Sequence, residues 1–347
     1  MIKTNFKFLV SLLIFIFLNQ ISLPLIAQRQ GGGFSGAYLF RENGTRPISL
    51  AGAYTAISND PYTIFYNPAG LSSCAPVPMV YSSLSLMEFS RNYANLTYAQ
   101  SIGDFGIGAS ISSHYAGSII ARNRTGNEIG KLSDYFFNLA LGGSFATNFA
   151  SFGLVVKYLN NTLQGSDVSG SGVAFDFGSK FNVMDLFTFG IVVQNIGGII
   201  KYNTRSEKSN IPFTIRSGIA MEFPLSAGKI ITFRNELGME DTIIQPPPKY
   251  LLFSIESNYI QYEKYPNFIL ACEFAPFELL AFRGGITLAG NDEGKFKLLP
   301  FTTWGAGVSI KPNLKDFYNL FCIDLSLGND FLAEKKIFYT IGIGIQF

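Results

Sequence analysis

Apolar and polar residues alternate along most of this chain. From about residue 79 onward, alternate positions are apolar in segments of roughly 9 to 11 residues, the pattern of strands that cross a membrane in a barrel. The last segment, KIFYTIGIGIQF at 336–347, has Ile, Tyr and Phe at its odd positions and Lys, Thr, Gly and Gln at most even ones. Because successive side chains of a strand point to opposite faces, we expect the odd set to face lipid and the even set to face inward.

The same alternation predicts about 14 strands, an even number, as single-chain bacterial barrels have. The segment 229–237 would spoil this tally if it crossed the membrane. We assign it to a long excursion that includes QPPPKY, because the consecutive prolines cannot donate ladder hydrogen bonds. The predicted strands are 79–88, 91–100, 104–115, 133–144, 150–160, 170–180, 186–194, 211–222, 250–259, 267–275, 279–287, 302–311, 318–327 and 336–346.

A secreted β-sandwich also alternates, but it hides its apolar face in a core and exposes a polar one. Here the inward set is small and polar, whereas the outward set is large and aromatic, which favours lipid outside and a narrow lumen inside. The expected fold is therefore an all-β, 14-stranded antiparallel transmembrane β-barrel. Long loops are expected at 116–132, 161–170, 200–210, 224–249 and 288–300.

The N-terminus has the pattern of an export signal over residues 1–27, with Lys3 and Lys7 before an apolar core and Ala27 at the end. A transmembrane anchor is the alternative, but Asn19, Gln20 and Pro24 interrupt the apolar run. No later stretch is apolar enough for a spanning helix, so a membrane protein of this sequence has to be a closed barrel. We divide the chain into a signal peptide (1–27), a leader and plug (28–76) and a barrel (77–347).

Composition excludes several functional classes. The net charge is +2, charged residues make up 14% of the chain, and no basic cluster suited to nucleic acid occurs. Three widely spaced cysteines form neither a disulfide framework nor a zinc pattern. GGGFSG at 31–36 follows no strand, and His114 is the single histidine, so we expect no catalytic residue, metal or cofactor.

Charged residues also fall at inward positions in the second half of the predicted barrel, and their charges nearly cancel. Because unpaired charges in a confined space are costly, we expect them to pair with one another or with the plug. Contact with a substrate is the alternative role. The residues are Arg216, Glu222, Glu256, Glu273, Arg283 and Asp324.

The segment RPISLAGAYTAISNDPYTIFYNPAGL at 46–71 does not alternate. Pro47 suits the start of a helix, small residues follow, and Asn59, Asp60 and Pro61 would end it. In YNPAGL we expect a tight turn, with Pro68 fixing the backbone and Gly70 supplying a permissive one. A slim helix and a turn would suit a short helical plug held inside the barrel.

Together with VVQNIGG at 192–198, GGIT at 284–287 and IGIGIQF at the C-terminus, this segment resembles the PorV/PorQ family, relatives of the FadL-type long-chain fatty acid transporters. GNEIG at 126–130 is more similar to PorQ-like members. The resemblance covers the mature chain and implies a FadL-like fold. It also implies that Asn67, Pro68, Ala69 and Gly70 form the motif of an N-terminal hatch.

The resemblance implies two possible functions in the bacterial outer membrane. PorV/PorQ-like proteins are accessories of type IX protein secretion and of surface attachment, with translocon components and exported cargo as partners. FadL-like barrels pass hydrophobic small molecules through a lateral opening in the wall after the hatch shifts, usually where a kinked strand breaks its ladder. We favour the secretion role at this point and keep the diffusion channel as the alternative.

Overall fold

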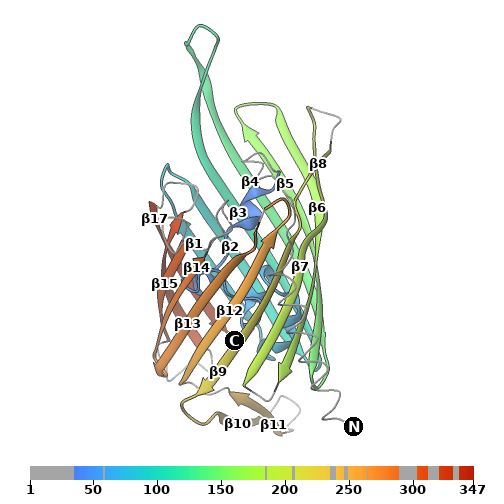
Figure 1. The fold of residues 1–347 in the computed structure, drawn as a ribbon, viewed down its shortest axis with the longest axis vertical. Helices are drawn as coiled ribbons and strands as arrows, with labels where there is room; N and C mark the ends of the chain where they lie inside the picture. Colours follow the sequence, from blue (N-terminus) through green and yellow to red (C-terminus); the bar gives the residue numbers. More distant parts are fainter. Residues whose placement is uncertain are drawn as a thin grey trace.

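The computed structural model describes residues 35–57, 59–183, 186–204, 208–234, 240–245, 249–263, 265–288, 303–311, 320–330 and 336–347. The predicted signal peptide and residues 28–34 of the leader lie outside these ranges, as do Pro246, Pro247 and Pro248. The described chain forms a tall antiparallel barrel with the N-terminal segment inside it (Figure 1). Among the described residues, no helix has the length and hydropathy needed to cross a membrane.

The barrel wall follows the alternation of the sequence closely. Its strands are β1 (Met79–Leu86), β2 (Asn92–Ile102), β3 (Phe105–Arg122), β4 (Glu128–Ala146), β5 (Ala150–Gln164), β6 (Val168–Val183), β7 (Phe187–Tyr202), β8 (Lys208–Asn210), β9 (Thr214–Pro224), β12 (Tyr250–Ile260), β13 (Asn267–Phe277), β14 (Leu280–Leu288), β15 (Thr303–Ile310), β16 (Leu320–Asp330) and β17 (Lys336–Gln346).

The ladder closes on itself because each strand pairs with its neighbours and β1 pairs with β17. The short β8 and the longer β9 both pair with β7 and share one position in the wall. The fifteen strand segments therefore make a closed 14-strand antiparallel barrel, as predicted.

Side-chain burial has the expected period of two. On β17, Tyr339, Ile341 and Ile343 are exposed on the outer face, whereas Thr340 is buried on the inner one. The same separation recurs around the wall, where exposed Phe, Leu and Ile side chains cover the outside. An outer surface of this kind suits hydrocarbon rather than water.

Three predicted loops are partly strand. β3 and β4 continue through most of 116–132 as a long hairpin that projects beyond the barrel rim (Figure 1). A bulge between Tyr115 and Ser118, where Gly117 has a φ of 90°, interrupts the alternation of apolar and polar residues. The alternation therefore did not predict that the two strands continue beyond it. Parts of 161–170 and 200–210 likewise belong to β5, β6, β7 and β8.

The excursion after β9 leaves the barrel, as expected. β10 (Lys229–Arg234) and β11 (Glu240–Gln245) form a separate two-stranded sheet at the end opposite the long hairpin (Figure 1).

The prediction of a slim helix from Pro47 to about residue 58 is wrong. The α-helix α2 covers only Thr45–Ser49, and 3-10 turns make up the other regular parts of the plug: η1 (Ala37–Phe40), η2 (Pro61–Phe65) and η3 (Pro68–Ser73). Ala51 and Gly52 take positive φ values of 50° and 88° directly after α2, which ends the helix. Gly70 lies within η3 and needs no positive φ, so its predicted permissive role is also wrong.

Candidate functional site

The plug is fixed to the wall through the Asn67-Pro68-Ala69 motif. Asn67 is fully buried, and its Oδ1 accepts a hydrogen bond from Ala69 N at 3.2 Å, which caps η3. Its Nδ2 donates to Thr55 O at 2.9 Å and to Ser179 O of β6 at 3.0 Å. One side chain therefore joins two parts of the plug to the barrel.

Inward glycines of the wall let the plug backbone approach closely. A Cβ at Gly153 on β5 would overlap the backbone of Pro68 and Ala69, and one at Gly305 on β15 would overlap the backbone of Ile48. Only a residue without a side chain fits at such contacts. The wall is thus shaped for this plug in its present position.

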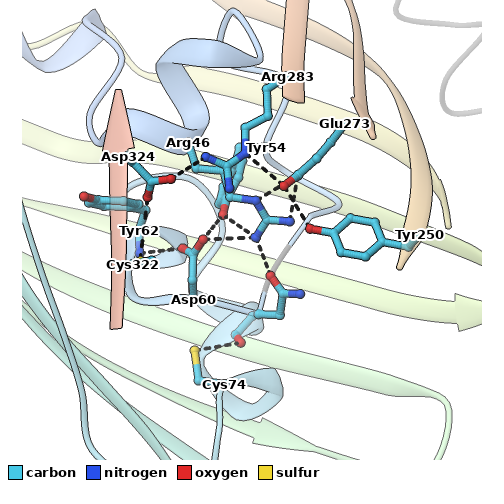
Figure 2. Close-up of polar contacts among 12 residues, drawn as sticks. Arg46, Tyr54, Asp60, Tyr62, Cys74, Tyr250, Glu273, Arg283, Cys322 and Asp324 are labelled. Atoms are coloured by element: carbon cyan, nitrogen blue, oxygen red, sulfur yellow. Dashed lines mark hydrogen bonds and ion pairs between the residues drawn. The ribbon is translucent and has the colours of Figure 1, made fainter. Parts of the chain in front are cut away.

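A buried charge network centres on Arg46 of the plug (Figure 2). Arg46 forms ion pairs with Asp60 at 3.0 Å and with Glu273 of β13 at 2.9 Å. Arg283 joins Glu273 at 2.9 Å to Asp324 at 2.7 Å, and Tyr250 donates to Glu273 at 2.9 Å. Removing one member would leave a buried charge unpaired, which is costly, so the network holds plug and wall together.

A second ion pair joins β9 and β12. Arg216 Nε donates to Glu256 Oε1 at 2.6 Å, and its second branch donates to Gly52 O of the plug at 2.5 Å. Glu256 also accepts from Thr55 N at 2.8 Å. Glu222, the sixth of the predicted lumen charges, makes no ion pair within the described ranges, so the expected pairing fails for this residue.

Burial sets the protonation of the plug groups. It raises the pKa of the Tyr54 phenol well above its usual value, so Tyr54 keeps its proton and donates it to Asp60. Burial alone would lower the pKa of Arg46, but Glu273 and the other partners outweigh it and raise the pKa above its ordinary value. The Arg46 guanidinium therefore stays charged at all physiological pH values.

Strand β7 contains the main irregularity of the wall. Between Val193 and Ile196 it has two residues opposite one of β6, and between Ile196 and Ile199 it again has two opposite one. These are consecutive bulges, and Asn195 and Gly197 take positive φ values of 60° and 63° there. A break of this kind re-aims side chains and loosens the ladder.

The pairing on the other side of β7 is interrupted at the same level. The β7–β9 ladder ends at Gln194 and Thr214, and the β7–β8 ladder starts at Ile199 and Asn210. Between these pairs, Ile211 N donates to Gly198 O at 2.9 Å. We call residues 194–198 and 211–213 the β7 interruption.

A hollow of about 430 Å³ lies at the β7 interruption. Its lining combines outward apolar side chains with residues that face the lumen. The hollow thus reaches from the outer surface into the wall. The lining residues are Val193, Asn195, Ile196, Gly197, Gly198, Ile199, Asn210, Ile211, Phe213, Gln261 and Tyr262.

The plug lies on the lumen side of this hollow. Ile211 is buried in a small apolar cluster with Tyr38 of η1 and with Leu159 and Ile200 of the wall. Gln194, at the start of the interruption, donates to Phe65 O of η2 at 2.7 Å. Packed apolar side chains, including Ile211, therefore lie between the hollow and η1 of the N-terminal segment.

The pattern of apolar and polar residues did not lead us to predict this site. The segment VVQNIGG contributed only to the resemblance to the PorV/PorQ family. The signal was present: alternation fails at QNIGG, and Gly pairs inside a strand mark bulges. Arg46, Lys157 and Asp176 were also absent from the predicted charge network. Arg46 lies in the non-alternating plug segment, where strand parity gives no orientation.

No group of three potential metal ligands occurs in the part of the chain that the structure describes. His114 lies among aromatic rings, with Tyr93, Phe136 and Tyr38 at centroid distances of 5.7, 5.6 and 6.4 Å. Those surroundings are those of a packed core residue rather than of a catalytic base.

The fold is similar to solved FadL-type channels. The chain matches the CymD monoaromatic hydrocarbon channel with a TM-score of 0.55 and 12% identity, over 87% of this chain and 96% of that one. It matches the P. putida toluene transporter TodX with a TM-score of 0.55 and 11% identity, over 88% and 96%. A Pseudomonas aeruginosa FadL homologue gives 0.54 and 8%, over 88% and 98%.

No protein-family model matches the sequence, and neither does any curated protein. The assignment to PorV/PorQ proteins is therefore without support in these comparisons. The part of the resemblance that stands is the FadL-like architecture: the chain is a closed 14-strand barrel like those of hydrocarbon channels.

Proposed function

We propose that this chain is an outer-membrane channel for small hydrophobic compounds, which pass through the barrel wall at the β7 interruption. The observation that carries the proposal is the 430 Å³ hollow, because it joins the lipid-facing surface to the apolar cluster behind Ile211. Ligand sites in proteins are concave and mostly apolar with a few polar groups, as this one is.

The proposed direction of passage follows from the plug. Its ion pairs and close backbone contacts make movement of the whole plug costly, so a straight path down the lumen is blocked. An apolar molecule that has entered from the extracellular rim gains by leaving sideways into hydrocarbon. The β7 interruption offers that exit without displacement of α2 or η3.

The comparisons support the compound class. Solved structures of this fold include channels described as carrying monoaromatic hydrocarbons and toluene. We therefore place the preferred compound among small, uncharged, mainly apolar molecules, and the outer membrane is the matching location.

The secretion role that the sequence favoured is the weaker reading. The comparisons back the hydrophobic channel better. The projecting β3–β4 hairpin is where a protein partner would bind. Loss of surface-attached exported proteins in a deletion strain, with hydrocarbon uptake unchanged, would restore that role.

The proposal can be tested with a variant that fills the hollow without changing the rest of the barrel. Ile196 is an exposed residue that lines the hollow, so Ile196→Trp should obstruct it. Ile341 on β17 is similarly exposed but distant from the interruption, so Ile341→Trp is the matched control. Uptake of labelled toluene and of a long-chain fatty acid is measured in a strain whose own channel gene is deleted.

We expect Ile196→Trp to reduce uptake of at least one compound towards the level of the deletion strain, because the indole fills the hollow, and Ile341→Trp to transport like the parent protein. Uptake by Ile196→Trp equal to that by the parent protein, or uptake by the parent no higher than that of the deletion strain, would contradict the proposal.

A further inference from the structure

Lys157, Asp176 and Asn195 form a buried polar group on the inner side of the β7 interruption. Lys157 Nζ lies 2.7 Å from Asp176 Oδ2 and donates to Asn195 Oδ1 at 3.0 Å. Asp176 Oδ1 accepts a hydrogen bond from Asn195 N at 2.8 Å. All three side chains are buried, and they come from β5, β6 and β7 respectively.

The position of this group relative to the bulges is informative. Asp176 is the single β6 residue that faces Gln194 and Asn195 across the first bulge. A bulge leaves its extra residue outside the ladder, so the Asn195 N–H needs another acceptor. The Asp176 carboxylate is that acceptor, and a charged acceptor makes a stronger hydrogen bond than a carbonyl does.

Asn195 also has a backbone conformation that favours Asn and Gly over other residues. Its φ of 60° lies in the left-handed region. Lys157 holds the side chain of the same residue through its carboxamide oxygen. Main chain and side chain of Asn195 are thus both fixed by one ion pair on the neighbouring strands.

We infer that Lys157 and Asp176 are positioning residues that hold β7 in its bulged form and so keep the hollow formed. The inference rests on the proposed function only for its consequence in transport. That Lys157 of β5 and Asp176 of β6 hold β7 in its bulged form does not depend on the proposed function. The compound need not contact either residue, because they act through Asn195.

The structural test measures amide hydrogen exchange of the full-length protein in lipid nanodiscs. Asp176→Asn removes the charge that pairs with Lys157 and weakens the hydrogen bond from the Asn195 N–H, since a neutral carboxamide is the weaker acceptor. We expect exchange across 193–199 to rise on the order of tenfold or more, with β1 and β17 unchanged. Lys157→Arg keeps the charge and should retain most of the protection.

The control is Arg122→Gln, which removes an exposed ion pair between Arg122 and Glu128 on the projecting hairpin. It should leave 193–199 protected. If Asp176→Asn does not give a folded barrel, the double variant Lys157→Met/Asp176→Leu removes both charges, leaves neither unpaired and still deprives Asn195 of its partners.

Unchanged exchange at 193–199 in both Asp176→Asn and the double variant would overturn the inference. Toluene uptake by the same proteins separates it from the proposed function. If the parent protein takes up no hydrophobic compound while exchange responds as expected, the channel fails and the positioning role stands. If the parent transports while Asp176→Asn and the double variant both exchange normally, the positioning role fails and the channel stands.

Discussion

At the scale of single residues, the face of the wall on which a side chain lies decides its chemistry. Cys272 lies on β13 between Ala271 and Glu273. Those two side chains are buried on the inner face of the wall, whereas Cys272 is half-buried. Its parity places it with the outward Leu270 and Phe274. Cys74 instead ends the plug and is buried, with its thiol directed to Gly70 O at 3.8 Å.

This difference predicts selective modification. Burial raises the pKa of the Cys74 thiol well above its usual value, so little thiolate forms there at pH 8. We expect a lipid-soluble maleimide to label Cys272 in the folded protein and to leave Cys74 unlabelled, as mapped by mass spectrometry. Cys272→Ser should abolish the labelling. Rapid labelling of Cys74 under these conditions would show that the plug is not packed as described.

At the scale of elements, the alternation of apolar and polar residues predicted the strands of the wall well and the helix and turns of the plug poorly. Every predicted strand is present because alternate burial leaves a direct trace in the sequence, as in KIFYTIGIGIQF. The plug has no such period: its chain direction is set by contacts with the wall, such as Asn67 with Ser179 and Arg46 with Glu273. Contacts between residues far apart in sequence leave no local pattern, which is why the helix expected from Pro47 was too long.

The fit of η3 against β5 predicts how a wall glycine responds to substitution. Gly153→Val places a side chain where the backbone of Pro68 and Ala69 lies. Overpacking costs roughly 1–3 kcal/mol where side chains can shift, and a backbone contact shifts less readily. We expect the barrel to unfold at a lower temperature, as measured by the change in its electrophoretic mobility on heating. We also expect residues 35–76 to become sensitive to protease.

Gly143→Val is the matched control for that change. Gly143 lies on neighbouring β4, where a Cβ would make only an ordinary van der Waals contact, with Gly106 O at 3.8 Å. This variant should match the parent protein in both assays. Protease resistance of the plug in Gly153→Val would mean that η3 does not pack on β5.

At the scale of the whole molecule, the barrel combines a firmly held plug with one weak place in its wall. The Arg46–Glu273 ion pair joins the plug to the wall, and Arg216 of the wall donates to Gly52 O of the plug. The β7 interruption lies where the ladder is broken on both sides of one strand. An apolar compound would meet the least resistance there.

We propose that a hydrophobic compound occupies the hollow at the β7 interruption on its way through the wall. Anomalous X-ray diffraction from crystals of the protein soaked with a brominated monoaromatic compound would locate it, because bromine marks the position of the bound molecule. We expect an anomalous peak between Ile196 and Ile211 that disappears in Ile196→Trp crystals. Peaks confined to the lipid-facing surface of other strands, with none in the hollow, would contradict it.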